Sequence, residues 1–370
     1  MHKKITGEPS RSLPPLPSPV SPADRTAPGA ATQPAMRSRS PAFADLPASR
    51  TGGAARVSAG PAKISDAELS LAVYLLARAV DGRPVAGSEI SRLRLANASV
   101  NETRQLLKHG RGNVDVDVRA TNNESTWRTK AARTFRLERE RKANVPWNAF
   151  EQRAPYSAAA ASVFGAGNCG EHASTTSVYH SRRLAPGEEV HYVSDPAAGH
   201  TWAEGRVPDA PPAEQPERTV VMDAWTVGSA VLASDARFAK RRAGLETTLR
   251  FDAETGRDAR ITANDLVLEA RSRGPAEIAR RVQSEAGPTA RFAAFIDSVL
   301  PSGIGHWREQ HVLDRNFSQR VKGKLAAPAD QAQILGLAVR VAEQLGVSPQ
   351  QRSAEAQRIV EAAHAMLPDR

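Results

Sequence analysis

The spacing of apolar residues predicts that ordered structure begins near residue 65. Ser65 and Glu68 have the spacing of a capping box at a helix start. The apolar residues behind them recur every three or four positions, as on one face of a helix: Leu69, Val73, Leu76 and Val80. Gly82 and Pro84 then end the predicted helix.

Two longer helices are expected next, from Ser88 to about His109 and from about Ser125 to Ala143. Between them, Asp115 and Asp117 alternate with valines. Alternation predicts the solvent face of a strand, since successive side chains of a strand point to opposite faces. The two aspartates could equally belong to a target-binding surface.

The middle of the chain changes character after the small-residue turn from Gly165 to Gly170. A short helix to about Tyr179 should follow this turn. Three short runs rich in β-forming residues come next: Glu189 to Val193, His200 to Glu204, and Thr219 to Trp225. From about Ala263 the pattern is helical to the end. The sequence therefore predicts an α+β fold, with helices on both sides of a helix-and-antiparallel-sheet core.

Residues 1–62 differ in composition from the rest. They are dense in Pro, Ser, Ala and Gly, which cannot bury enough apolar area to offset chain entropy, so a disordered tail is expected. Behind it we expect a helical N-terminal part (63–160), a catalytic core (161–260) and a C-terminal helical part (261–370).

No apolar run is long enough to span a membrane. His2 stands where an N-myristoylation signal needs glycine.

The net charge of +10 and a pI near 10.1 raise the possibility of nucleic-acid binding. Most of the positive charge comes from arginines that are spread along the chain and mixed with acidic residues. There is no long basic run with interleaved aromatic residues. This pattern favours a compositional bias over a nucleic-acid site, and we expect no nucleic-acid partner.

The single cysteine, Cys169, excludes an intramolecular disulfide. A lone cysteine is by default a small buried apolar residue. Cys169, however, lies in Gly-Asn-Cys-Gly, directly before a predicted helix. Free N–H groups and the positive end of a helix dipole stabilise a thiolate and an oxyanion. Cys169 is therefore a candidate nucleophile.

A thiol nucleophile needs a base, and the base needs a group that orients it. His200 begins a predicted strand and can return to the start of the cysteine helix. Asp223 lies in the otherwise apolar run Val220 to Trp225. A carboxylate in such a run requires a partner, because an isolated buried charge is very costly. We therefore expect Cys169, His200 and Asp223 to form a catalytic triad.

Three segments carry a family resemblance. Gly-Asn-Cys-Gly-Glu-His-Ala at 167–173, Gly-His-Thr-Trp-Ala-Glu at 199–204 and Val-Met-Asp-Ala-Trp at 221–225 resemble the AvrPphE/HopX/XopE family. The stretch that begins at Gly112 with Gly-Asn-Val-Asp-Val-Asp-Val and reaches Thr-Trp-Arg at 126–128 resembles the block this family carries before its cysteine. The family comprises type III secreted effectors of plant-pathogenic bacteria in the transglutaminase-like cysteine-enzyme superfamily.

This resemblance implies a papain-like/transglutaminase-like core and a virulence function inside a plant cell. By matching motifs, the family's nucleophile is Cys169, its base is His200 and its orienting acid is Asp223. The chemistry would be acyl transfer by a cysteine protease or other hydrolase, a deamidase or a transglutaminase. Residues 1–62 would carry the secretion signal. The expected partners are host proteins and a type III secretion chaperone. The expected location is the host cytoplasm, with the nucleus and the membrane periphery as further destinations.

The remaining candidates have weaker support from the sequence. Asn148 or Gln152 could donate a second hydrogen bond to an oxyanion. His172 is expected to be structural, and His180 and His191 lack the partners of a zinc site, so neither a metal nor another cofactor is expected. Trp202 and Trp225 are expected in the core or the cleft wall. The rival hypotheses are a non-catalytic module that binds host proteins and carries a vestigial triad, and a basic nucleic-acid binder.

Overall fold

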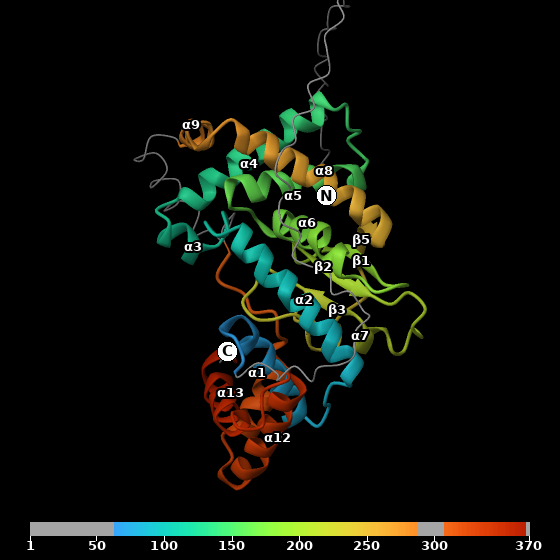
Figure 1. The fold of residues 1–370 in the computed structure, drawn as a ribbon, viewed down its shortest axis with the longest axis vertical. Helices are drawn as coiled ribbons and strands as arrows, with labels where there is room; N and C mark the ends of the chain where they lie inside the picture. The colour runs from blue at the N-terminus through green and yellow to red at the C-terminus, as the bar shows by residue number, and fades with distance from the viewer. Residues whose placement is uncertain (1–62, 287–306, 368–370) are drawn as a thin grey trace, which may run out of the picture. The chain divides into compact units, whose positions relative to one another are not determined.

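The computed structural model describes residues 63–286 and 307–367 (Figure 1). The predicted tail, residues 1–62, lies outside the described residues, and the domain boundaries remain predictions. None of the helices in the described part is both long and apolar enough to cross a membrane.

The predicted N-terminal helices are confirmed to within a few residues. They are α1 (Asp66–Val80), α2 (Gly87–Leu106) and α4 (Glu124–Lys142). Helix α1 is buried over residues 71–78, and its first turn is more exposed. It packs against the C-terminal helices α12 (Gln331–Gln344) and α13 (Arg352–Met366) (Figure 1).

The predicted strand around Asp115 and Asp117 is wrong. This segment forms a short helix, α3 (Asp115–Ala120). Asp117 accepts three hydrogen bonds of 2.7 Å from Arg111, one from its backbone N–H and two from its guanidinium. This pairing holds the aspartate against the preceding turn, an interaction that alternation with valines does not reveal.

Two helices lead to and contain the candidate nucleophile. Helix α5 (Phe150–Phe164) is not predicted by the sequence pattern, since Pro155 lies inside it and removes a helical N–H donor. Its alanine-rich face packs against α4, α6 and α8. Helix α6 (Cys169–His180) begins at the cysteine and packs against strand β2.

The sheet has five antiparallel strands in the order β4-β3-β2-β1-β5. Their bounds are β1 Glu189–Asp195, β2 His200–Arg206, β3 Val220–Met222, β4 Val231–Leu232 and β5 Glu246–Phe251. The first three confirm the predicted runs, although β3 ends before Asp223. The other two were not expected, because β4 has only two residues and β5 alternates only at Leu249 and Phe251. The protein is therefore an α+β protein, mostly helical.

The helical region after the sheet begins earlier than expected, at Ala253 rather than near Ala263. Its remaining members are α8 (Ala253–Ser272), α9 (Pro275–Glu285) and α11 (Arg315–Leu325). A second, smaller core joins α4, α5, α8 and α9 around Phe135 and Phe164, whose rings meet edge to face at 5.9 Å.

Helix α8 approaches the end of α6 very closely at Gly256. A Cβ at this position would lie 2.2 Å from the Cβ of Ser181, which begins the short 3-10 helix η1 (Ser181–Arg183). Only glycine allows this contact without movement of one backbone relative to the other. In contrast, Gly336 on the exposed face of α12 has no atom within 4 Å of such a Cβ.

We predict opposite effects of alanine at these two helical glycines. Gly256→Ala should lower the free energy of unfolding by about 1–3 kcal/mol, because overpacking outweighs the gain in helix propensity. Gly336→Ala, the matched control, should raise it by about 0.5–1 kcal/mol. Urea unfolding of both variants measures the difference. Equal effects would show that α8 does not depend on this close contact.

Candidate active site

Cys169 is half-buried and is the first residue of α6. The N–H groups of the first turn of a helix have no acceptor within the helix, so those of Cys169 and Gly170 remain donors. The turn before the cysteine is tied to α6, because the N–H of Asn168 donates to Glu171 Oε2 at 2.8 Å. Glu171 in turn accepts two hydrogen bonds from Arg133, at 2.8 and 3.1 Å. This chain of contacts fixes the start of the helix.

The segment 109–112 lies along the turn that precedes the cysteine. His109 N–H donates to Gly165 O at 2.8 Å, and Gly167 N–H donates to Gly110 O at 3.3 Å. A Cβ on Gly112 would lie 2.3 Å from the Thr129 hydroxyl, so only glycine fits there. Gly112 N–H donates to Gly167 O at 3.3 Å, so the segment that begins at Gly112 also supports the turn before Cys169.

His200 and Asp223 form a buried pair. His200 Nε2 lies 2.7 Å from Asp223 Oδ2, and the two residues are 1 % and 3 % exposed. Asp223 directly follows β3 rather than lying inside it. Its other oxygen, Oδ1, accepts the backbone N–H groups of Trp225 at 3.2 Å and Thr226 at 3.3 Å. Because the strand ends before Asp223, the backbone N–H groups of the following turn can donate to this carboxylate. Within a strand, such N–H groups would pair with the neighbouring strands.

Arg104 of α2 fixes the chain that follows Asp223. Its guanidinium donates to the carbonyl oxygens of Ala224, Thr226 and Gly228. Burial lowers the pKa of Arg104 to about 10, and the nearby charge of Asp223 opposes this shift. The arginine remains charged at neutral pH and compensates the buried carboxylate.

The second ring nitrogen of His200 faces Cys169. Burial lowers the pKa of His200, but the charge and hydrogen bond of Asp223 outweigh burial, and Cys169 adds to the rise, so the pKa reaches about 9. Within the described chain, His200 Nδ1 is buried and accepts or donates no hydrogen bond. The thiol of Cys169 lies close enough to the ring to contribute to its raised pKa. Nδ1 is the atom available to take the thiol proton.

Aromatic rings enclose the His200 imidazole. The ring centroids lie 4.4 Å away for Phe238, 4.8 Å for Trp225, 5.7 Å for Trp202 and 6.3 Å for Trp307. The two tryptophans predicted as core or cleft wall are 1 % exposed each. These rings exclude water from the imidazole and so cause the burial that opposes the rise of its pKa.

Polar side chains hold these tryptophans in place. Trp202 Nε1 donates to Glu204 at 2.9 Å, and Glu204 is itself fully buried and paired with Arg242. Asn113 holds two others, since its side-chain oxygen accepts from Trp225 Nε1 at 3.1 Å and its backbone oxygen accepts from Trp307 N–H at 2.7 Å. The site is thus completed by segments before and after the sheet.

The other histidines are engaged elsewhere. His172 Nδ1 lies 2.9 Å from Asn168 O on its own helix, and burial lowers its pKa to about 4. His180 Nδ1 lies 2.9 Å from Ser99 Oγ, and His191 Nε2 lies 2.9 Å from Glu189. No three His, Cys, Asp or Glu side chains cluster as metal ligands among the residues described. That the protein needs no metal or cofactor stays a prediction.

Neither of the two residues expected to support an oxyanion lines the cavity beside the start of α6. Asn148 lies in an exposed turn, and Gln152 lines a different cavity with Tyr156 and Thr262. The hydroxyl of Tyr192 on β1 lies beside the start of α6, since it would be 3.2 Å from a Cβ on Gly170. Burial raises the pKa of Tyr192 to about 12, and the charges of Cys169 and Glu171 add to this rise.

Sequence reasoning missed Tyr192, Phe238 and Trp307 as parts of this site, and it placed Asn113 in the upstream block without giving it a role. No motif or spacing links Tyr192, Phe238 and Trp307 to the proposed triad, because they converge only through sheet pairing and the crossing of distant segments. No family profile, curated protein or solved structure matches the chain.

We predict a pH-dependent stability from the His200–Asp223 pair. The folded-state pKa of His200 is raised, so its stabilisation is complete below its unfolded value of about 6.5 and is lost as pH rises through about 9. Asp223→Asn removes the carboxylate that causes the rise. The stability advantage of the wild type over this variant should therefore shrink between pH 6 and pH 9.5, by about 3 kcal/mol at most.

Urea unfolding at several pH values measures this difference. Asp209→Asn, which removes an exposed carboxylate, is the control and should show a difference from the wild type that does not vary with pH. A pH-independent difference for Asp223→Asn would mean that the pair does not hold a proton in the folded state.

Proposed function

We propose that the chain is a cysteine-nucleophile acyl-transfer enzyme with a papain-like/transglutaminase-like catalytic core. Cys169 is the nucleophile, His200 the base and Asp223 the orienting acid. The observation that carries the proposal is the buried 2.7 Å contact between His200 Nε2 and Asp223. It leaves Nδ1 free toward a thiol at a helix N-terminus.

The proposed reaction proceeds through a thioester. His200 Nδ1 takes the proton of Cys169, and the thiolate attacks the carbonyl carbon of a carboxamide or a peptide bond. His200 then gives the proton to the leaving amine or ammonia. Water or a second amine, deprotonated by His200, attacks the thioester and releases the thiol. Proteolysis, deamidation and transamidation share these steps and differ only in the leaving group and the acceptor.

Two donors are proposed for the oxyanion. The first is the backbone N–H of Cys169, which points out of the first turn of α6. The second is the Tyr192 hydroxyl rather than a side chain at 148 or 152. Its position beside Gly170 supports this role, and its raised pKa keeps it protonated as a donor at neutral pH.

The biological setting is proposed from the sequence resemblance. The cysteine, histidine and aspartate motifs and the upstream block resemble the AvrPphE/HopX/XopE effectors, and in the fold the upstream block contacts the nucleophile turn. On this basis we propose a type III effector that modifies plant host proteins in the host cytoplasm. A secretion chaperone is a proposed partner inside the bacterium.

Substitution of the triad separates catalysis from binding. Cys169→Ala should abolish iodoacetamide labelling and all activity, and His200→Ala should lower activity by roughly 10³-fold or more, because the base is lost. Asp223→Asn should retain at least as much activity as either. Activity is read by mass spectrometry of plant-cell extract incubated with each protein, as cleavage, deamidation or crosslinks. A folded Cys169→Ala protein with full effector activity in plant tissue would favour the non-catalytic binding module.

The oxyanion role has its own test. Tyr192→Phe keeps the ring but removes the hydroxyl, so kcat should fall by about 10²-fold while KM changes little. Iodoacetamide labelling of Cys169 should be unchanged, because alkylation forms no oxyanion. Tyr156→Phe, in the cavity that Gln152 lines, is the matched control. An unchanged kcat for Tyr192→Phe would remove this residue from the mechanism.

A further inference from the structure

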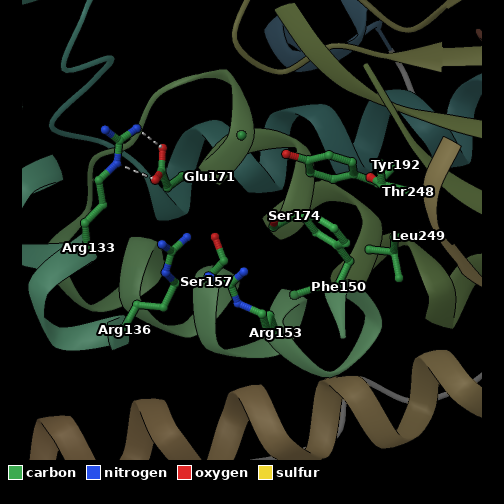
Figure 2. Close-up of a pocket in the computed structure, with 12 residues that line it drawn as sticks. Arg133, Arg136, Phe150, Arg153, Ser157, Glu171, Ser174, Tyr192, Thr248 and Leu249 are labelled. Carbon is green, nitrogen blue, oxygen red and sulfur yellow. Dashed lines mark hydrogen bonds and ion pairs between the residues drawn. The ribbon is translucent and has the colours of Figure 1, made fainter. Parts of the chain in front are cut away.

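A cavity of about 140 Å³ lies at the start of α6, the helix that begins with Cys169 (Figure 2). Gly170 and Glu171, the two residues after Cys169, form part of its wall, and Tyr192 forms another part. Three guanidinium groups face it, from Arg133, Arg136 and Arg153. The cavity therefore concentrates positive charge next to the candidate nucleophile.

The arginines outnumber the carboxylates that they contact. Arg133 is satisfied by the bidentate pair with Glu171. Arg136 and Arg153 share a single carboxylate, Glu140, at 3.4 and 3.2 Å. Three cations thus face two anions, which leaves one positive charge without a counter-ion in the cavity wall.

Arg136 supplies most of the unused donors. Its only ion pair is the 3.4 Å contact of Nε with Glu140, and this nitrogen makes no hydrogen bond among the described residues. Its terminal nitrogens also lack acceptors within the described chain. In Figure 2 its guanidinium points into the cavity, with the Ser157 hydroxyl between it and Arg153. The side chain is 24 % exposed, so a ligand from solvent can reach it.

We propose that this cavity binds a carboxylate of the substrate, so that the enzyme acts on acidic protein segments. The inference rests on the proposed function and adds the substrate class to it. Planar guanidinium groups bind carboxylates through paired, charge-assisted hydrogen bonds. Arg136 is the principal ligand, and Ser157 is a second donor. The volume suits one acidic side chain close to the amide that Cys169 attacks.

The test compares two alkylating reagents that differ only in charge. Iodoacetate is an anion and iodoacetamide is neutral, and both form a C–S bond at Cys169 with release of iodide. The rate with iodoacetate is divided by the rate with iodoacetamide, for Cys169 and separately for glutathione. In the wild type, this ratio should be about tenfold higher for Cys169 than for glutathione. Arg136→Gln should remove this preference. Arg141→Gln, the same change on an exposed part of the same helix, should keep it.

Competition in the wild-type protein gives a second, variant-free measurement. Succinate should slow alkylation by iodoacetamide and raise the thermal midpoint of the protein through binding to the folded state. Inorganic phosphate should be the weaker competitor. Stronger protection by phosphate would overturn the assignment to a carboxylate. Equal relative rates for the two reagents, without protection by succinate, would overturn the site itself.

The outcomes separate this inference from the proposed function. Rapid iodoacetamide labelling without a preference for iodoacetate leaves the thiol enzyme intact and rejects the carboxylate site. If neither reagent labels Cys169 faster than it labels glutathione, the hypothesis that Cys169 is an activated thiol is rejected. The thermal shift with succinate, which needs no thiol chemistry, then still decides whether the cavity binds a carboxylate.

Discussion

The burial of an imidazole and a carboxylate against each other is the constraint on which the rest of the site depends. Two groups that are nearly inaccessible to water lose their hydration and must find partners inside the protein. Asp223 finds them because β3 ends at Met222 and the following turn presents two N–H groups. Arg104 then holds that turn by three carbonyl oxygens. The position of the carboxylate is therefore fixed by backbone geometry as much as by the histidine.

The same constraint explains why the site draws on distant parts of the chain. The predicted core, 161–260, contains the three residues of the proposed triad but not all the walls around His200. Asn113, from before the core, fixes Trp225 and Trp307, and Trp307 itself comes from after it. These segments keep water from the imidazole. The segments on both sides are thus part of the site's construction rather than additions to a self-sufficient core.

Local patterns in the sequence predict many of the helices and strands and the three residues of the proposed triad. The elements and site residues that they do not predict depend on contacts between distant parts of the chain. Periodicity places α1, α2 and α4, and the run of β-formers places β1 and β2, because local spacing determines which face is buried. The pattern fails at α5, where Pro155 is tolerated within a helix surrounded by α4, α6 and α8, and at Asp117, whose pairing with Arg111 outweighs alternation. The triad segments are local motifs. Tyr192 lies on β1, Arg133 and Arg136 on α4, and Arg153 on α5, and only tertiary packing brings these three elements together.

The charge balance around Cys169 links the nucleophile to the cavity. In the proposed mechanism, Asp223 balances the imidazolium, and the thiolate lies near the arginines of the cavity, since the charge of Cys169 acts on Arg133. Formation of a thioester removes the negative charge from sulfur. The surplus charge is then free to pair with a carboxylate of the bound substrate. The arginines would bind such a carboxylate more tightly once the sulfur has lost its charge than they do in the initial complex. An interaction that strengthens along the reaction accelerates the chemical step, whereas uniform binding does not. An acidic group at this position would therefore contribute to rate as well as to selection.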